Sequence, residues 1–388
     1  MKKALIVANL AGFGSFLLSD MDILHEYGYD VYFAANASNH EWEDTRNELE
    51  KRNVRFFHID FDTKNPFTKQ NYSAYKQISK ILKLEKIDLV HCHTPIAGIV
   101  TRLATVKYRK RGMKVIYTTH GFAFTSYSSK KSWFLYRTVE SLGSLFCDAI
   151  ITINREDFAN AKKLHCNKVY YIPGAGVNTD VYRHVDINRA EYRRSIGVKD
   201  DEIMILSVGE LSERKNHQII IEALSRIQNK GKYVYVICGS GINGGTCQYL
   251  KKLAEEKKVT LYLLGFRMDI PEITVCSDIG AIPSLREGLG FAGVQSLAAG
   301  IPVIGTDVQG IRDYILNDKT GYLCKKNDAD AFAEAILLLS DSSKREAMKN
   351  DCIKTAEKFD ITASIEQRKK IYQEILKKSS LQTDEPVV

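Results

Sequence analysis

A carboxylate and two glycines stand together at residues 287–290, in the sequence Glu-Gly-Leu-Gly, directly before a predicted helix. Free backbone N–H groups at a helix start attract anions, and Gly288 and Gly290 let that backbone approach a ligand closely. Glu287 is out of place beside an anion unless it contacts hydroxyl groups of the same ligand. A phosphate joined to a sugar meets both demands. The alternative is a turn that serves packing alone.

Two cationic side chains that are able to bind phosphate follow the strand expected at 204–208. Arg214 offers a planar fork and Lys215 a point charge, and together they would neutralise a diphosphate. A solvated basic pair is the alternative. The next two strands end in Gly239 and in the run 265–267, Gly-Phe-Arg, which offer close backbone approach and a ring for stacking.

Two turns in the first half of the chain carry weaker signals. The first turn contains Gly12 and Gly14, but a dinucleotide fingerprint would need a third glycine where Leu17 stands. An NAD-dependent oxidoreductase is therefore a weak hypothesis, whereas a glycine-lined phosphate loop and a plain turn both stay open. His120 ends the fifth strand beside a glycine, a place from which an imidazole can enter a pocket. A structural histidine is its alternative.

Metal binding has little support in the sequence. His91 and His93 alternate on one strand, so both could point to the same face and converge on an ion. No acidic residue lies nearby, and we expect no metal site there.

The elements that must position these residues alternate between strand and helix, twice over. This pattern is typical of parallel sheets covered by helices on both faces. Strands are expected at 3–8, 30–35, 55–59, 89–92, 114–118, 149–153, 169–172, 204–208, 234–238, 260–264, 279–282 and 302–305. Helices are expected at 15–26, 41–51, 72–84, 97–108, 133–145, 156–164, 216–229, 246–256, 291–299, 328–340, 342–359 and 362–378.

The run Pro-Gly-Ala-Gly at 173–176 interrupts this alternation and predicts a linker. We expect an α/β protein of two doubly wound, Rossmann-like domains, 1–176 and 177–361, that face a cleft at the carboxyl ends of their strands. The helix at 362–378 would return to the first domain. Residues 379–388 are polar, and a disordered tail is expected there.

Composition narrows the class of protein. The 388 residues are enough for two cores, and 44% hydrophobic with 26% charged residues is typical of a soluble globular protein. No apolar run reaches the roughly 18 residues of a membrane span. The N-terminus resembles a signal peptide, but its apolar run is short and Asp20 and Asp22 follow, so we expect a strand. The eight cysteines contain no C-x-x-C pair, as in a reducing cytosol.

Charge is distributed unevenly. Residues 1–180 hold 25 Lys and Arg against 18 Asp and Glu, and no acid occurs between Asp88 and Glu140. Aromatic residues are interleaved with the cations of that stretch, which suits anionic lipid headgroups. A solvated basic face is the alternative, and nucleic acid is not expected because no recognition motif accompanies the charge. The cations are Arg102, Lys107, Arg109, Lys110, Arg111, Lys114, Lys130, Lys131 and Arg137.

Taken together, these motifs resemble those of retaining glycosyltransferases of family 4, which have the GT-B fold. The segments that carry the resemblance are a Gly-x-Leu…Arg-Lys stretch from Gly209 to His217, an acidic motif from Glu287 to Gly300, and the turn Thr118 to Gly121. The match covers nearly the whole chain. Further stretches, 88–95, 115–122, 151–154 and 170–178, resemble the branch that builds bacterial capsular and exopolysaccharides.

The resemblance implies roles for individual residues. It implies a UDP-linked sugar donor, no cofactor or metal, and an acceptor saccharide on a polyprenyl diphosphate at the cytoplasmic face of an anionic plasma membrane. Glu287 would orient the transferred sugar, and His120 would contact the sugar or assist the acceptor hydroxyl. The implied diphosphate-binding residues are Gly14, Arg214, Lys215, Gly288, Leu289, Gly290 and Phe291. The implied ribose- and nucleobase-binding residues are Gln295, Gly239, Phe266 and Arg267.

Two positions depart from the family pattern. Gln295 stands where the family has its second glutamate, and an amide accepts ribose hydroxyls more weakly than a carboxylate does. Glu210 stands where the family often has arginine, so it would face away from the phosphates. Two other classes therefore stay open: a sugar-nucleotide epimerase of the same fold, which needs no acceptor, and a non-catalytic nucleotide-sugar-binding protein.

Overall fold

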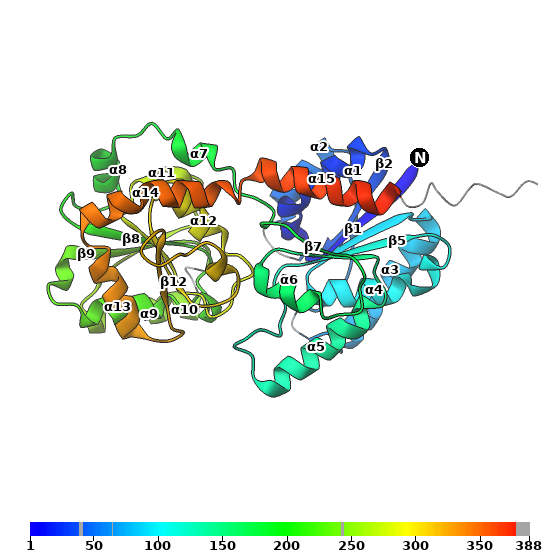
Figure 1. The fold of residues 1–388 in the computed structure, drawn as a ribbon, viewed down its shortest axis with the longest axis horizontal. Helices are drawn as coiled ribbons and strands as arrows, with labels where there is room; N and C mark the ends of the chain where they lie inside the picture. The colour runs from blue at the N-terminus through cyan, green and yellow to red at the C-terminus, as the bar shows by residue number, and fades with distance from the viewer. Residues whose placement is uncertain (39–41, 64, 242–243, 378–388) are drawn as a thin grey trace, which may run out of the picture. The chain divides into compact units, whose positions relative to one another are not determined.

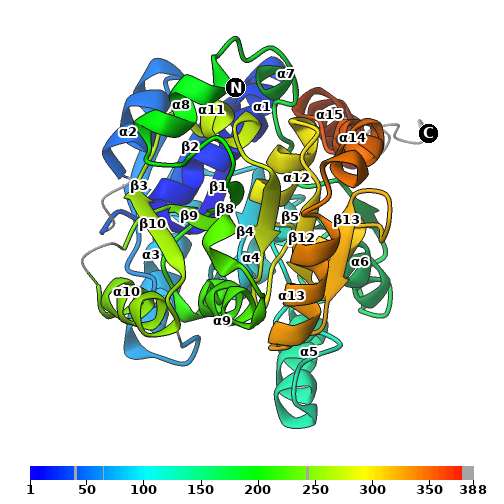
Figure 2. The same cartoon turned by 90° about the vertical axis from the view of Figure 1, so that its left-hand side faces the viewer.

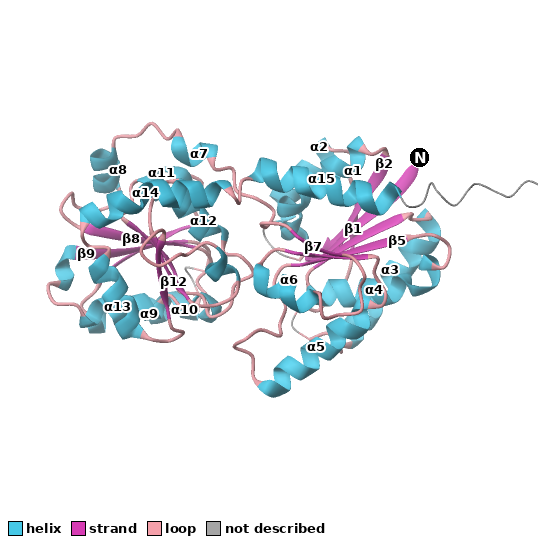
Figure 3. Ribbon diagram, in the orientation of Figure 1, coloured by secondary structure: helices cyan, strands magenta, loops and turns pink. Residues whose placement is uncertain are grey.

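The chain forms two compact α/β units in the computed structural model, which describes residues 1–38, 42–63, 65–241 and 244–377. Unit 1 comprises Met1–Ala175 together with the described residues from Ser364 onward, and unit 2 comprises Gly176–Ala363. Each unit has a central sheet with helices on both faces (Figures 1 and 3). The expected fold class, two doubly wound Rossmann-like domains, is confirmed.

Unit 1 is built on a parallel sheet that, within the described residues, has seven strands in the order β3-β2-β1-β4-β5-β6-β7. The strands form because their apolar runs are buried on both faces: Leu5, Ile6 and Val7 of β1 are fully buried. Their bounds are β1 Lys2–Leu10, β2 Tyr29–Asn36, β3 Arg55–His58, β4 Leu89–His93, β5 Lys114–Thr119, β6 Ala149–Thr152 and β7 Val169–Tyr171.

The helices of unit 1 cover this sheet from two sides. In Figure 1, α1, α2 and α15 lie over one face and α3, α4 and α6 over the other, while α5 extends away from the sheet. The bounds are α1 Leu18–Glu26, α2 Trp42–Lys51, α3 Lys69–Glu85, α4 Pro95–Arg109, α5 Lys130–Ser144, α6 Arg155–Ala161 and α15 Ile361–Lys377.

Unit 2 repeats the design with a parallel sheet of six strands within the described residues, in the order β10-β9-β8-β11-β12-β13. Helices again lie on both of its faces (Figure 2). The strands are β8 Ile203–Val208, β9 Tyr233–Cys238, β10 Thr260–Gly265, β11 Ile279–Ile282, β12 Val303–Thr306 and β13 Gly321–Cys324. The helices are α7 Asp180–Arg183, α8 Arg189–Ser195, α9 Gln218–Arg226, α10 Gly245–Lys257, α11 Ile270–Val275, α12 Phe291–Ala298, α13 Ala329–Leu338 and α14 Ser342–Glu357.

Several expected elements differ from the observed ones. The helix expected at 15–26 is a 3₁₀ segment, Ala11–Leu17, followed by α1, and Gly14 is tightly packed within that segment. The short strand β13 and the short helices α7, α8 and α11 were not expected from the sequence. The position expected to start the helix at 41 and the tail expected at 379–388 lie outside the described residues.

Helix α15 is tied to the sheet of unit 1 by a buried polar chain. Arg368 on α15 donates to Asp20 at 2.8 Å, and Tyr372 donates its hydroxyl to the same carboxylate at 3.1 Å. Nδ1 of His91 then lies 2.6 Å from the Tyr372 hydroxyl, and its Nε2 lies 2.7 Å from Oγ1 of Thr118. Both ring nitrogens of His91 are therefore used in hydrogen bonds that hold β4, β5 and α15 together.

Within the described residues, no helix is long and apolar enough to cross a bilayer.

This network predicts that unit 1 loses stability in acid. Burial lowers the pKa of His91 to about 4, against about 6.5 in the unfolded chain. Between those values the unfolded state binds the proton more readily, so the free energy of unfolding falls as pH falls from 6.5 towards 4, by up to about 1.4 kcal/mol per pH unit. Urea unfolding of wild type and His91→Gln at pH 7.5 and 5.5 measures this contribution.

His91→Gln should be less stable than wild type at pH 7.5, and its free energy of unfolding should fall less than that of wild type when the pH is lowered to 5.5. His184→Gln, at an exposed position of unit 2, is the control and should behave like wild type. Equal losses between the two pH values for wild type and His91→Gln would contradict the prediction.

Candidate functional site

The residues predicted to bind phosphate and sugar come together at one point of unit 2. Neighbouring strands β8 and β11 run parallel, and the chain crosses to opposite sides of the sheet after them, so their carboxyl ends form the crevice where doubly wound sheets bind ligands. The loop after β8 carries Arg214 and Lys215, and the loop after β11 carries Glu287. The backbone N–H of Leu285 donates to the Arg214 carbonyl at 2.8 Å and joins the two loops.

Glu287 is the centre of this cluster. Its Oε2 accepts from Nζ of Lys215 at 2.8 Å and from the hydroxyl of Ser284 at 3.0 Å. The carboxylate is 13% exposed, and burial alone would raise its pKa, but the charges of Lys215 and Arg214 outweigh burial and leave the pKa below its usual value. Glu287 is therefore ionised at neutral pH. Ser284 is a contact that the sequence analysis missed.

The stem of Lys215 reaches the carboxylate by crossing a glycine. Gly209 has a φ of +151°, and a Cβ there would stand 3.2 Å from Cε of Lys215. A side chain at this position would crowd the lysine and disfavour the backbone conformation. The Gly-x-Leu start of the motif therefore has a physical reason: it leaves the path of the lysine open.

Arg214 is shared between two carboxylates. It pairs with Glu210 at 2.8 Å, while Glu287 lies 3.4 Å from the same guanidinium. Glu210 was expected to face away from the phosphates, but its carboxylate instead contacts Arg214, one of the two cations proposed to bind them. Its pair with Arg214 is substantially exposed, and such pairs contribute only about 0.2–1 kcal/mol.

His217 fixes the loop that carries both cations. Its Nε2 lies 3.1 Å from the Glu210 carbonyl, and its Nδ1 lies 2.9 Å from the hydroxyl of Tyr235 on β9. Burial lowers the pKa of His217 to about 4, so the ring is neutral at pH 7. The histidine holds the backbone against the sheet, which gives the last residue of the motif a structural role.

The glycine-rich turn leads directly into α12. Gly290 precedes the helix with a φ of +82° and carries no side chain to cap the first turn. Below it lies the buried Tyr314, whose hydroxyl donates to the Gly290 carbonyl at 3.3 Å. Leu289 is buried in the same turn, and Phe291 begins the helix. No sequence motif indicated Tyr314, because it supports the turn through packing against Gly290 and Gly293 and one hydrogen bond from a distant part of the chain.

The residues predicted to bind ribose and base differ in their exposure and in their partners. Gln295 lies half-buried on α12, four residues into the helix. Phe266 is 74% exposed, as a stacking ring could be, but Arg267 is paired with Asp269 at 2.8 Å. A side chain at Gly239 would collide with the backbone of the loop after β8, so this glycine has a packing role. Their nucleotide contacts stay predictions.

In unit 1 the corresponding crevice is formed by the ends of β1, β4 and β5. His120 directly follows β5; its Nε2 lies 3.2 Å from Nδ1 of His93, and the ring of Phe13 packs edge-on at 4.7 Å. Desolvation, with smaller effects of nearby charges, lowers the pKa of His120 to about 4, so the imidazole is neutral at pH 7. Gly14 has a packing role against Phe33 and Thr45, and its phosphate contact stays a prediction.

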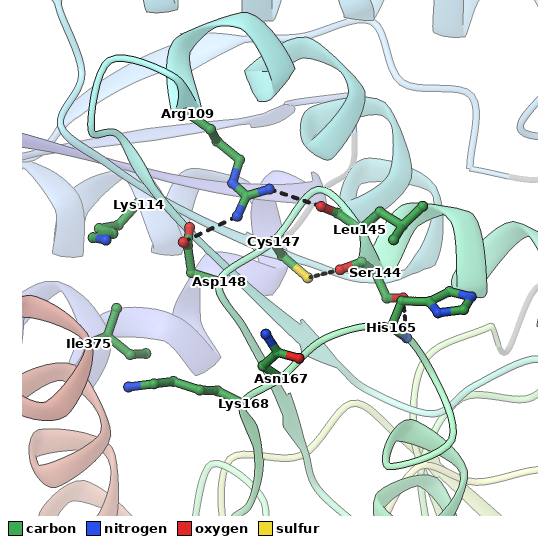
Figure 4. A pocket seen from close by; sticks show the side chains of 10 residues that line it. All are labelled: Arg109, Lys114, Ser144, Leu145, Cys147, Asp148, His165, Asn167, Lys168 and Ile375. Atoms are coloured by element: carbon green, nitrogen blue, oxygen red, sulfur yellow. Dashed lines mark hydrogen bonds and ion pairs between the residues drawn. The ribbon is translucent and has the colours of Figure 1, made fainter. Parts of the chain in front are cut away.

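A separate cavity of unit 1 lies at the other end of its strands, opposite the crevice at His120 (Figure 4). It is lined by Lys114, which begins β5, and by Asp148, which precedes β6, so it opens at the amino ends of the strands. Arg109 reaches Asp148 at 3.2 Å and the Leu145 carbonyl at 2.9 Å. The guanidinium of Arg109 is therefore already hydrogen-bonded within unit 1. The cavity is distinct from the crevice at His120.

The basic and aromatic face expected between Asp88 and Glu140 is exposed only in part. Arg102 is completely buried and bonds Glu140 at 2.8 Å, and the rings of Tyr117, Phe122 and Phe124 belong to the core. The aromatic side chains of the stretch that do reach the surface include Tyr127, Phe134 and Tyr136.

Comparisons with known proteins agree with this geometry. Residues 188–359 match the family model for glycosyl transferases of group 1, and residues 22–181 match the model for glycosyltransferase family 4. The putative glycosyltransferase EpsD of Bacillus subtilis is 36% identical over 315 residues, 80% of this chain and 82% of its own. An Escherichia coli enzyme, UDP-Gal:alpha-D-GlcNAc-diphosphoundecaprenol alpha-1,3-galactosyltransferase, is 30% identical over 328 residues, 82% of this chain and 84% of its own.

Solved structures show the same fold. Anabaena Alr3699/HepE, crystallised with UDP and glucose, aligns with a TM-score of 0.76 at 17% identity, covering 96% of this chain and 100% of that one. WaaG, a glycosyltransferase of lipopolysaccharide biosynthesis, aligns with a TM-score of 0.70 at 17% identity, covering 95% and 99%. With both halves matched by the models and relatives aligned along four fifths of its length, the chain belongs to the family 4 glycosyltransferases.

Proposed function

We propose that this protein is a retaining glycosyltransferase that moves a sugar from a UDP-linked donor to a saccharide carried on a polyprenyl diphosphate. The product would enter capsular, exopolysaccharide or related cell-surface glycan biosynthesis. The relative from Escherichia coli bears a name with both a UDP-sugar and a diphosphoundecaprenol acceptor, and the relative from Bacillus subtilis is a putative glycosyltransferase. The first name supports this choice of donor and acceptor, and the second supports sugar transfer alone.

The observation that carries the proposal is the 2.8 Å contact between Lys215 and the buried carboxylate of Glu287 at the crevice of unit 2. One group in this pair can neutralise a phosphate, and the other can accept hydrogen bonds from sugar hydroxyls. A ligand that uses both must carry the two chemistries side by side, as a nucleotide-sugar does.

In the proposed mechanism, the cations stabilise the departing nucleotide. Breakage of the sugar–phosphate bond leaves negative charge on the diphosphate, and preorganised donors at that charge lower the barrier. Lys215, Arg214 and the backbone at 288–291 would supply them. Glu287 would orient the sugar, and the acceptor hydroxyl would attack the face that the diphosphate leaves, so that anomeric configuration is retained. Ribose would bind near Gln295.

We propose that His120 contributes from unit 1, by contact with the transferred sugar or the acceptor hydroxyl. A neutral imidazole can accept a proton at neutral pH, although the low pKa of His120 makes it a weak base. We also propose that unit 1 associates peripherally with an anionic membrane at its cytoplasmic face, where a polyprenyl-linked acceptor would reside.

The proposed function is tested by a transfer assay with purified protein. UDP-, GDP- and ADP-sugars would be offered with N-acetylglucosamine linked to polyprenyl diphosphate, in excess EDTA. We expect transfer from a UDP-sugar that survives the chelator, because Lys215 and Arg214 would stabilise the charge that a metal ion otherwise would. Loss of transfer in EDTA with recovery in Mg²⁺ would contradict the mechanism. Epimerisation of a UDP-sugar without acceptor would favour the epimerase alternative.

The two carboxylates beside Arg214 have different proposed roles, so their alanine variants should differ in different measurements. Glu287→Ala removes the proposed sugar contact and should lower turnover at least ~100-fold, the size of one lost transition-state interaction. Glu210→Ala removes a competing anion and should tighten UDP binding up to about fivefold, the equivalent of one exposed ion pair. Turnover assays and calorimetric titration with UDP measure the two effects.

Glu213→Ala is the control for both variants. Its side chain lies on the same loop, is exposed, and forms no ion pair within the described residues. It should match wild type in turnover and in UDP affinity. If Glu287→Ala kept turnover within a few-fold of wild type, or Glu210→Ala weakened UDP binding, the assigned roles would be wrong.

A further inference from the structure

An apolar groove opens on the surface of unit 1, among the helices that cover its sheet. It has a volume of about 600 Å³ and lies where the segment before α3 meets α3, α4 and α5. Helix α4 contacts both α3 and α5, and α5 extends beyond the others (Figures 1 and 2). The groove is lined by Pro66, Phe67, Thr68, Asn71, Tyr72, Tyr75, Ile99, Val100, Leu103, Val139 and Leu142.

The lining contains no charged side chain, and much of it is open to solvent. Phe67 is 76% exposed, Tyr72 60%, Leu103 46% and Leu142 57%. Its two polar side chains besides the tyrosines serve the backbone: Thr68 caps α3, and Asn71 bonds the preceding loop. Soluble proteins rarely expose contiguous apolar surface of this kind without an occupant.

A buried ion pair fixes the shape of the groove. Arg102 of α4 bonds Glu140 of α5 at 2.8 Å, and Glu140 also accepts from the hydroxyl of Tyr117 at 3.0 Å. A side chain at Gly143 would collide with Arg102, so this glycine lets the two helices approach. Leu103, Val139 and Leu142 are therefore held on helices whose spacing is set, and the groove is a built feature rather than a loose surface.

The exposed charges on the three surrounding helices have one sign. Between residues 63 and 147 the acids are Glu85, Asp88 and Glu140, of which Glu140 is buried and the other two hold the N-terminal segment through Lys3. None of the exposed cations on these helices forms an ion pair within the described residues. They are Lys69, Lys76, Lys80, Lys83, Lys107, Lys130 and Lys131.

We propose that this groove binds the isoprenoid chain of the lipid-linked acceptor. The proposal rests on the proposed function, which requires such an acceptor, and it adds the place where the lipid is held. An uncharged, rigid apolar groove suits a hydrocarbon chain, and its volume falls in the range of small-molecule sites. The surrounding cations suit a chain that ends in a diphosphate and lies in an anionic bilayer.

A protein partner fits these observations less well. A partner helix would need acidic residues to match the cations and would bury an area larger than this groove offers. Straight acyl chains of the bilayer are also apolar, and dodecyl diphosphate represents them in the experiment. These occupants, and a second copy of this chain, are distinguished by the experiment.

The experiment measures binding directly, with UDP at saturation so that the donor site is filled. The probes are isopentenyl, geranyl and farnesyl diphosphate, titrated by calorimetry, with dodecyl diphosphate as the straight-chain comparison. We expect affinity to rise with chain length, at least about tenfold from geranyl to farnesyl diphosphate, because each added unit buries further CH₂ groups. Dodecyl diphosphate should bind at least about threefold more weakly than farnesyl diphosphate.

The double variant Leu103→Gln, Leu142→Gln should lose the dependence on chain length. Both positions are exposed, so the fold should tolerate the change. The matched control is Leu84→Gln, Leu337→Gln, which alters leucines of 65% and 52% exposure outside the groove and should bind like wild type. A benzophenone analogue of farnesyl diphosphate should label peptides from α3, α4 or α5, which locates the site without any variant.

Several results would overturn the proposal: affinity independent of chain length, equal binding of dodecyl diphosphate, labelling confined to unit 2, or a dimer in sedimentation velocity that the groove variant dissociates. Because no sugar transfer is measured, the groove and the enzyme activity fail separately. Binding that depends on chain length without any sugar transfer would support the groove proposal and contradict the proposed transferase activity. Sugar transfer without such binding would support the activity and contradict the groove proposal.

Discussion

A single, largely buried carboxylate, Glu287, constrains the crevice of unit 2. Glu287 is mostly withdrawn from water, and a charge in that setting is stable only when it is paired and hydrogen-bonded. Lys215 and Ser284 meet that demand, and the loops after β8 and β11 are joined as a result. Gly209 opens the path of the lysine, and His217 holds the loop on which it sits. The proposed phosphate and sugar contacts all depend on this arrangement.

Unit 1 meets a similar constraint with neutral groups. Two buried histidines, His91 and His93, lie on β4 and a third, His120, directly follows β5; burial lowers the pKa of His91 and of His120 to about 4 and also lowers the pKa of His93. The rings therefore act as uncharged hydrogen-bonding groups at neutral pH. The ion pair between Arg368 and Asp20 places α15, at the far end of the chain, directly against this network. The integrity of the crevice thus depends on a helix that follows unit 2 in sequence.

The sequence predicted the sheets and the strand-end motifs well because both have local signals. Buried parallel strands appear as apolar runs, and glycines beside charged residues at strand ends indicate ligand loops. Contacts between distant positions had no such signal: Glu287 pairs with a lysine far back in the chain, and the buried Arg102 pairs with Glu140 on the next helix. The strand β13, Gly-Tyr-Leu-Cys, was missed because it begins with glycine and contains no β-branched residue, so its strand signal is weak.

The central claim is that the crevice of unit 2 recognises a diphosphate through Lys215. Calorimetric titration of wild type and Lys215→Ala with UDP and with uridine tests this most directly, because the two ligands differ only in the diphosphate. We expect wild type to bind UDP at least ~100-fold more tightly than uridine, and Lys215→Ala to lose most of that difference while its affinity for uridine is unchanged. Equal preference for UDP in the two proteins would contradict the account.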